Sequence, residues 1–194
     1  MLNRTMMVAS VVGCLAWTSA ANADTLVISY QVDGGGFFNL ASGTGTAGGT
    51  ANPAGFSIQA SAAESPPLPG VALHSNTLSI QTGLAGSHTI DVWVTSQQAV
   101  AAASWLSSFT TNLMASGWSV RESTAVGVTE LAFALFNSSN QTAQSVNNGP
   151  AGTFIYEWYH IITNGAGSVN ATIDMVQTPI PAALPLFISG LLGL

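Results

Sequence analysis

The sequence predicts an all-β protein, an antiparallel β-sandwich or jelly roll with at most one short helix at about 97–116. Three observations predict this class. Short segments of alternating apolar and polar residues recur along the chain, turns rich in Gly, Asn, Pro and Ser separate them, and helical spacing occurs in one place only. Many short strands with few intervening helices are typical of sandwiches and jelly rolls.

The first expected strand covers 25–32, where Leu26, Ile28 and Tyr30 share one face, as in a half-buried strand. A hairpin turn at 163–167 joins the last two strands. Further strand-like segments lie at 37–40, 55–62, 77–82, 87–96, 118–123, 126–136, 153–162 and 168–176. Gly- and Thr-rich residues 41–55 and polar residues 137–150 are expected to be loops, and residues 64–70 a proline-rich connector.

One segment departs from the strand pattern. Within 97–117, apolar residues that include Val100, Ala103, Leu106 and Phe109 recur at intervals of three and four. This spacing predicts a short helix or an irregular apolar loop over one end of the sheets.

Charged residues are scarce, at 5% of the chain, and they exclude several functions. Of the two basic residues, Arg4 and Arg121, only the second lies beyond the first 23 residues, whereas all eight acids follow them. Without basic residues a surface cannot neutralise phosphates, so we expect no binding to nucleic acid or to anionic lipid. The one cysteine, Cys14, leaves the rest of the chain without a disulfide or a thiolate.

The first 23 residues are typical of a secretory signal peptide. Arg4 precedes an apolar run, and small residues lead to Ala21-Asn22-Ala23, which predicts cleavage between Ala23 and Asp24. Two alternatives remain open: an uncleaved membrane anchor, and a lipoprotein in which Cys14 is acylated.

No catalytic residue, cofactor site or metal site is predicted. The histidines, His74, His88 and His160, lack the His-x-His and His-Glu-x-x-His spacings of zinc sites. Strand alternation directs His88 away from Asp91, and His160 away from Glu157. A calcium ion held by acids from distant loops stays open, because no group of acids lies within a dozen residues.

Aromatic residues form the candidate binding site. Tyr156, Trp158 and His160 point to one face of their expected strand, and Trp93 shares a face with Asp91 in another. Tryptophan and tyrosine on an exposed sheet stack on sugar rings, so Tyr156, Trp158 and Trp93 are candidate glycan contacts. The alternative is packing in the core, where aromatic side chains are common.

The chain closes with TPIPAALPLFISGLLGL, residues 178–194. Its apolar stretch, 182–194, has 13 residues, whereas a spanning helix needs about 20. The Pro179-Ile180-Pro181 motif followed by this stretch resembles a PEP-CTERM sorting signal of exported Gram-negative proteins. That resemblance implies processing by an exosortase-type enzyme, transient association with the inner membrane, and a host that makes exopolysaccharide.

This tail differs from the PEP-CTERM pattern in two ways. Ile180 stands in place of the glutamate, and no arginine cluster follows Leu194. Such a cluster would hold the tail at the cytoplasmic side, so we expect either a truncated chain or impaired sorting. An ordinary hydrophobic C-terminal strand is the alternative.

These observations predict a signal peptide (1–23), one β-sandwich domain (24–176) and a C-terminal sorting or anchor segment (177–194). The expected function is that of a non-catalytic cell-surface or extracellular-matrix protein. The alternatives are a module that binds carbohydrate, such as exopolysaccharide, and, less favoured, a secreted hydrolase.

Overall fold

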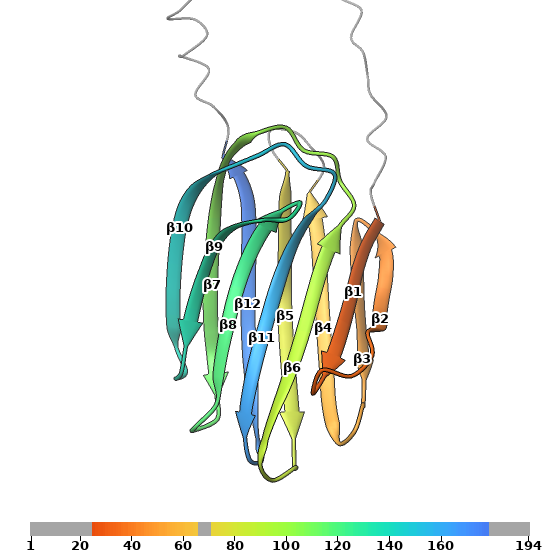
Figure 1. Ribbon diagram of the computed structural model, residues 1–194, viewed down its shortest axis with the longest axis vertical. Helices are drawn as coiled ribbons and strands as arrows, with labels where there is room; N and C mark the ends of the chain where they lie inside the picture. Colours follow the sequence, from red (N-terminus) through yellow and green to blue (C-terminus); the bar gives the residue numbers. More distant parts are fainter. Residues whose placement is uncertain (1–24, 66–70, 179–194) are drawn as a thin grey trace, which may run out of the picture.

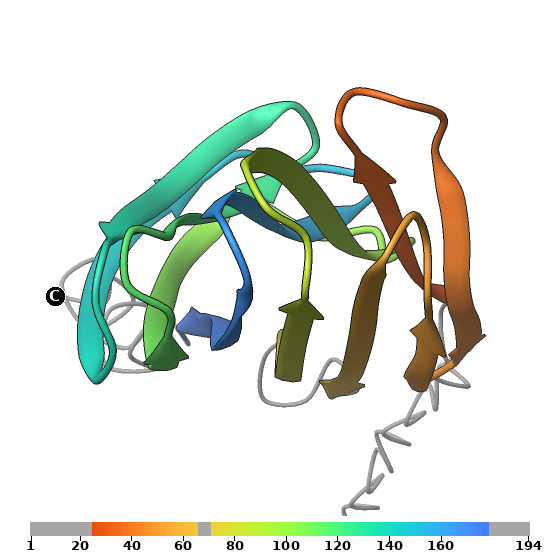
Figure 2. The same cartoon turned by 90° about the horizontal axis from the view of Figure 1, so that it is seen from below.

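The computed structural model describes residues 25–65 and 71–178. They form two six-stranded antiparallel sheets that pack face to face, as Figures 1 and 2 show. Sheet A has the strand order β2-β1-β6-β11-β8-β9, and sheet B has the order β10-β7-β12-β5-β4-β3. The predicted all-β antiparallel sandwich is therefore confirmed.

The strands of sheet A are β1 (Thr25–Val32), β2 (Phe38–Thr44), β6 (Ser87–Ser96), β8 (Ser119–Val126), β9 (Thr129–Phe136) and β11 (Ile155–Asn164). Those of sheet B are β3 (Thr46–Ala51), β4 (Phe56–Ser65), β5 (Ala72–Thr82), β7 (Ala103–Met114), β10 (Gln141–Gly149) and β12 (Gly167–Thr178). β1 begins and β12 ends at the same end of the sandwich (Figure 1). We call this the terminal end, and the opposite end the distal end.

The core lies between the sheets and follows from strand alternation. Every second side chain of β1, β6, β4 and β12 points inward and is almost wholly buried, while its neighbours point outward. Apolar burial of this kind is the main stabilising contribution in a sandwich. The largest fully buried side chains are Trp105, Trp118, Tyr159, Phe56 and Phe109.

The helical interpretation of residues 97–116 was wrong, because β7 occupies most of this segment and none of the described residues is helical. Trp105, Ser107, Phe109 and Thr111 alternate inward along β7. Two of these four core positions are polar, so the period of two is hidden in the sequence. Leu106 lies on the outer face, and counting it with inward residues produced the apparent helical spacing.

The Ser107 hydroxyl explains why a polar residue fits in this core. It lies 2.7 Å from the Thr124 hydroxyl of β8, so the two buried groups satisfy each other across the space between the sheets.

Two segments expected to be loops also form strands. Residues 41–55 contain the end of β2 and all of β3, and residues 137–150 contain β10. β2 is an edge strand of sheet A, and β3 and β10 are the two edge strands of sheet B. Edge strands bury little surface, so their sequences can be polar or glycine-rich and lack a hydrophobic pattern.

Two carboxyl groups lie inside the sandwich. Glu122 of β8 and Glu157 of β11 are fully buried between the sheets. Glu122 accepts a hydrogen bond from the Thr110 amide at 3.2 Å, whereas the oxygens of Glu157 have no hydrogen-bond partner among the described residues. The nearby Ser75 hydroxyl bonds instead to Tyr159 and to the Ile173 carbonyl.

Burial therefore governs the ionisation of both groups. Desolvation raises the pKa of Glu122 to about 9, and it raises the pKa of Glu157 well above its usual range. Glu122 consequently stays protonated at neutral pH, and burial favours the uncharged form of Glu157. Glu122 binds a proton more tightly in the folded state than in the unfolded state, so its contribution to stability falls between pH 4.5 and about 9.

We expect Glu122→Gln to reduce the loss of stability that accompanies rising pH. Gln keeps the shape of a protonated Glu and never ionises. The free energy of unfolding of the variant should therefore fall less steeply with pH, by up to about 1.4 kcal/mol per pH unit. Urea denaturation between pH 5 and 9 measures this slope. Glu130→Gln, a change at an exposed carboxylate, is the control, and equal slopes in all three proteins would contradict the assignment.

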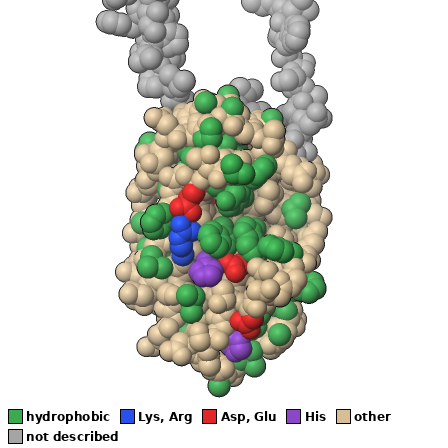
Figure 3. Space-filling model, viewed as in Figure 1, with side chains coloured by type: hydrophobic (Ala, Val, Ile, Leu, Met, Phe, Trp, Pro, Cys, Tyr) green, Lys and Arg blue, Asp and Glu red, His purple; other side chains and the backbone are tan. Residues whose placement is uncertain are grey.

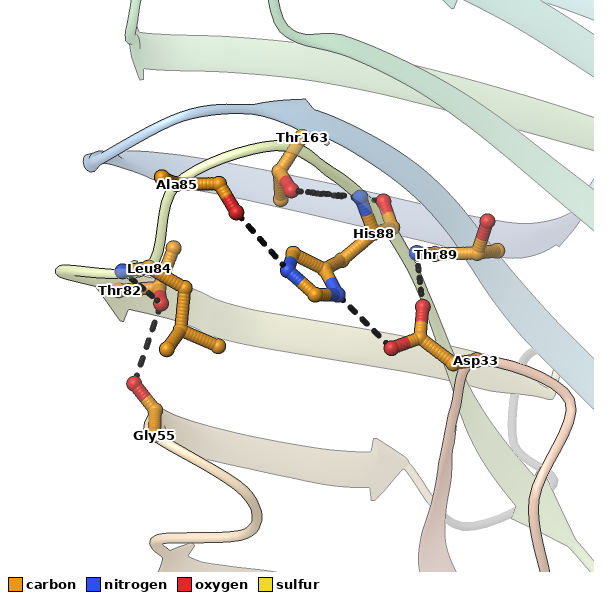
Figure 4. Close-up of polar contacts among 8 residues, drawn as sticks. All are labelled: Asp33, Gly55, Thr82, Leu84, Ala85, His88, Thr89 and Thr163. Carbon is orange, nitrogen blue, oxygen red and sulfur yellow. Dashed lines mark hydrogen bonds and ion pairs between the residues drawn. The ribbon is translucent and has the colours of Figure 1, made fainter.

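At the distal end, an Asp–His pair joins two turns (Figure 4). Asp33 accepts hydrogen bonds from the Thr89 amide and from Nδ1 of His88, both at 2.8 Å. Nε2 of His88 lies 3.3 Å from the Ala85 carbonyl. Both ring nitrogens face acceptors, so the imidazolium form of His88 satisfies both contacts.

The pKa values of this pair shift in opposite directions. The Thr89 amide and then His88 lower the pKa of Asp33, and the hydrogen bond to Asp33 raises the pKa of His88. The stabilisation is lost as pH falls through the lowered pKa of Asp33, and again as pH rises through the raised pKa of His88. The pair thus holds the distal turns best in mildly acidic solution.

Candidate functional site

The candidate glycan contacts lie together on the outer face of sheet A. Trp93 comes from β6, and Tyr156 and Trp158 come from β11, which pairs with β6. The register places Trp93 opposite Trp158 and Thr95 opposite Tyr156. Strand alternation directs all four side chains outward, so Tyr156, Trp158 and Trp93 lie on one outer face and not in the core.

An aromatic row crosses this face. Phe37, from the turn between β1 and β2, lies 4.8 Å from Trp93 between ring centroids. Trp93 and Trp158 stack in parallel, with centroids 6.4 Å apart and planes 3° apart. Phe37 is 67% exposed, whereas both tryptophans are half-buried. Figure 3 shows hydrophobic side chains gathered at the middle of this face, beside acidic, basic and histidine side chains.

Asp91 holds the tryptophan and histidine of β11 in place. Its Oδ1 atom accepts a hydrogen bond from Nε1 of Trp158 at 2.9 Å and from Nδ1 of His160 at 2.7 Å. Asp91 is only 8% exposed, so these two bonds satisfy a carboxylate that is largely removed from water. They also fix the orientation of the indole and imidazole rings.

Arg121 extends the row toward β9. Its guanidinium lies 4.6 Å from the ring centroid of Phe133 and 5.2 Å from that of Trp158. Both distances are within the range of cation–π attraction. Nη2 of Arg121 donates to both carboxylate oxygens of Glu130, at 2.8 and 2.7 Å.

A shallow groove continues the face at the terminal end. It is lined by Thr95, Gln97, Thr153 and Phe154. Phe154 stacks on Tyr156 with centroids 6.2 Å apart, so the groove adjoins the aromatic residues of β11. Its threonine hydroxyls and glutamine amide are groups that can donate and accept hydrogen bonds.

The chemistry of this face suits binding. It combines exposed or half-buried aromatic rings with a few fixed polar groups, the combination that sites for small ligands use. Within the two described ranges, no three His, Asp or Glu side chains lie close enough to hold a metal ion. The non-catalytic nature of the protein stays an expectation.

Part of this site was not found from the sequence. Strand alternation placed Asp91 beside Trp93, yet its bonds to Trp158 and His160 depend on the pairing of β6 with β11. Phe37, Arg121 and Phe133 were missed because they come from a turn and from β8 and β9. No sequence signal indicated that these elements would lie beside the tryptophans.

The predicted cleavage site at Ala23 and Asp24 lies outside the described residues, as do Cys14 and the motif Pro179, Ile180 and Pro181. The segments 1–23 and 179–194 are therefore not tested. In the described part of the chain, no helix has the length and hydrophobicity of a membrane span.

No protein-family model and no curated protein matches this chain. Among solved structures, it is similar to the CBM6cm-2 carbohydrate-binding module of Cellvibrio mixtus lichenase 5A, solved with cellotriose. The TM-score is 0.32 at 14% identity, over 70% of this chain and 88% of that one. A carbohydrate-binding module of the β-sandwich superfamily gives a TM-score of 0.36 at 8% identity, over 78% and 84%.

The chain is also similar to the enzymatically active domain of tailspike protein 4 of bacteriophage CBA120. The TM-score is 0.37 at 10% identity, over 60% of this chain and only 17% of the tailspike. All these likenesses are weak, so the functional proposal below rests on the chain's own residues.

Asp91→Ala should destabilise the protein and loosen the aromatic row. The substitution leaves the half-buried Trp158 indole without its acceptor, which costs about 1–3 kcal/mol. Urea denaturation measures the loss, and a red shift of tryptophan emission in the folded protein reports the loosened ring.

The matched control is Asp174→Ala, which breaks a similar pair, His74–Asp174, on sheet B. That pair contacts no tryptophan and is more exposed, so it should contribute little. Equal losses in both variants would contradict the positioning role of Asp91.

Proposed function

We propose that this protein is an exported, non-catalytic carbohydrate-binding protein of the cell surface or extracellular matrix. The outer face of sheet A binds the sugar. The observation that carries this proposal is the row formed by the tilted ring of Phe37 and the stacked rings of Trp93 and Trp158, beside the Asp91–His160 pair.

Two properties of the face support sugar as the ligand. A sugar ring has apolar C–H faces and a rim of hydroxyl groups, so it pairs well with aromatic rings bordered by hydrogen-bonding groups. Here the rings of Trp93 and Trp158 are parallel, and Asp91 and His160 lie beside them. Tryptophan also provides a large, rigid contact area at low entropic cost.

Export is proposed from the sequence. The sandwich begins at Thr25 and ends at Thr178, so it occupies the residues between the proposed signal peptide and the Pro179-Ile180-Pro181 motif. In this proposal an exosortase-type enzyme processes the tail during transient association with the inner membrane. Exopolysaccharide would then be a ligand available outside the cell.

Trp158→Ala should weaken sugar binding about tenfold or more, because one central aromatic contact contributes on the order of 1–2 kcal/mol. Affinity electrophoresis in gels that contain hydroxyethylcellulose, laminarin, galactomannan or alginate measures retention. Val146→Ala, at an exposed apolar residue of β10 in sheet B, is the control. Equal retention of Trp158→Ala and the wild type on every retained polymer would exclude this face as the site.

The export proposal has a separate test. Expressed in a Gram-negative host that makes exopolysaccharide, the protein should leave the cytoplasm and carry a mature N-terminus at Asp24. A version extended by arginines after Leu194 should lose its tail near Pro181. Cell fractionation and mass spectrometry of both termini give the result, and intact protein in the cytoplasm in both versions would overturn the proposal.

A further inference from the structure

We infer that this face binds an internal segment of a neutral, linear polysaccharide, which lies along β11. The inference rests on the proposed function and specifies its ligand. We call the site the track, defined as Phe154, Tyr156, Trp158 and His160 of the β11 segment with Asp91, Trp93 and Thr95 of β6.

The track runs along the strand. From Phe154 to His160, every second residue points outward and carries a ring, and the rise along a strand gives this series a length of about 20 Å. Neighbouring rings are in contact at both ends of the series, since Phe154 lies 6.2 Å from Tyr156 and Trp158 lies 5.5 Å from His160. A line of rings this long exceeds a single sugar unit.

Bulky side chains border the track on both flanks. Phe37 packs against Trp93 on the side of β1 and β2. On the other side, the Arg121–Glu130 ion pair and Phe133 adjoin Trp158. A ligand that follows β11 lies between these two flanks.

Among the residues that the structure describes, the track continues at both ends. At the terminal end it continues into the groove lined by Thr95, Gln97, Thr153 and Phe154. At the distal end, the next outward residue of β11 is Ile162, which is 41% exposed. A polysaccharide chain can therefore extend beyond the rings in both directions. An internal segment requires this, whereas a bound chain end requires room in one direction only.

The charges around the track favour a neutral ligand. Arg121 is bonded to both carboxylate oxygens of Glu130, and His160 is bonded to Asp91. Arg121 and His160, the basic side chains beside the rings, are thus each bonded to a carboxylate, and the whole chain carries a net charge of −6. An anionic polysaccharide would meet repulsion without a free cation to offset it.

The test is a chain-length series. Isothermal titration calorimetry is run with size-fractionated oligosaccharides of the neutral polymer that the gels retain, both intact and with the reducing end converted to an alditol. Affinity should rise with length up to roughly four units, the span of a track of about 20 Å. End reduction should leave the affinity of the longer chains unchanged.

Substitutions at two positions locate the ligand on the track. Phe154→Ala should weaken binding several-fold for the longer chains and leave the shortest chain unaffected. Trp158→Ala should weaken binding at every chain length. Val146→Ala should leave the affinity for short and long chains unchanged. Circular dichroism confirms folding of each variant, and the series on the wild type stands even where a variant does not fold.

The outcomes separate the two proposals. A wild type that binds none of the polymers overturns the proposed function, and this inference with it. Sugar binding that is independent of length, or lost on end reduction, overturns the track and leaves the proposed function intact. Stronger retention on alginate than on every neutral polymer overturns the assignment of a neutral ligand.

Discussion

The pairing of β6 with β11 is the constraint on which the rest of this structure depends. One antiparallel register places Trp93 opposite Trp158 and Asp91 opposite His160 on the outer face. Because side chains alternate, the same register directs Glu157 and Tyr159 into the core. A slip of β11 by one residue would turn Tyr156, Trp158 and His160 toward the core and Glu157 and Tyr159 toward water.

The same alternation places a carboxyl group in the sandwich. The strand that displays Tyr156, Trp158 and His160 outward has Glu157 among its inward residues. The protein accommodates this residue, and Glu122 of the neighbouring strand, because burial raises the pKa of both carboxyl groups and favours their uncharged form. Apolar burial on every side then offsets their desolvation.

The scarcity of charge has a parallel consequence on the surface. With Arg121 as the only basic residue beyond position 23, the three histidines are the remaining partners for carboxylates. Each one is paired through Nδ1: His74 with Asp174, His88 with Asp33, and His160 with Asp91. One pair lies on sheet B, one joins distal turns, and one orders the aromatic face, so a single type of contact has three structural uses.

The sequence alone determined the fold class, because alternation and turns are local properties of the chain. For the strands at 25–32 and 87–96 the expected and observed bounds agree. It also determined that Tyr156 and Trp158 would share one face of their strand, and it left open whether that face lies in the core or on the surface. Where the local pattern was weak the prediction failed: β7 hides its period behind Ser107 and Thr111, and β3 and β10 are polar edge strands.

Tertiary structure alone decided which of these residues meet. β6 and β11 are separated by nearly sixty residues in the chain, and no local pattern encodes their pairing. The contacts of Asp91 with Trp158 and His160, and of Arg121 with Trp158, exist only because non-local strand pairing brings them to one face. Sequence periodicity fixes the direction of a side chain, whereas its neighbours depend on the order of strands in the sheet, which is set by the packing of the whole core.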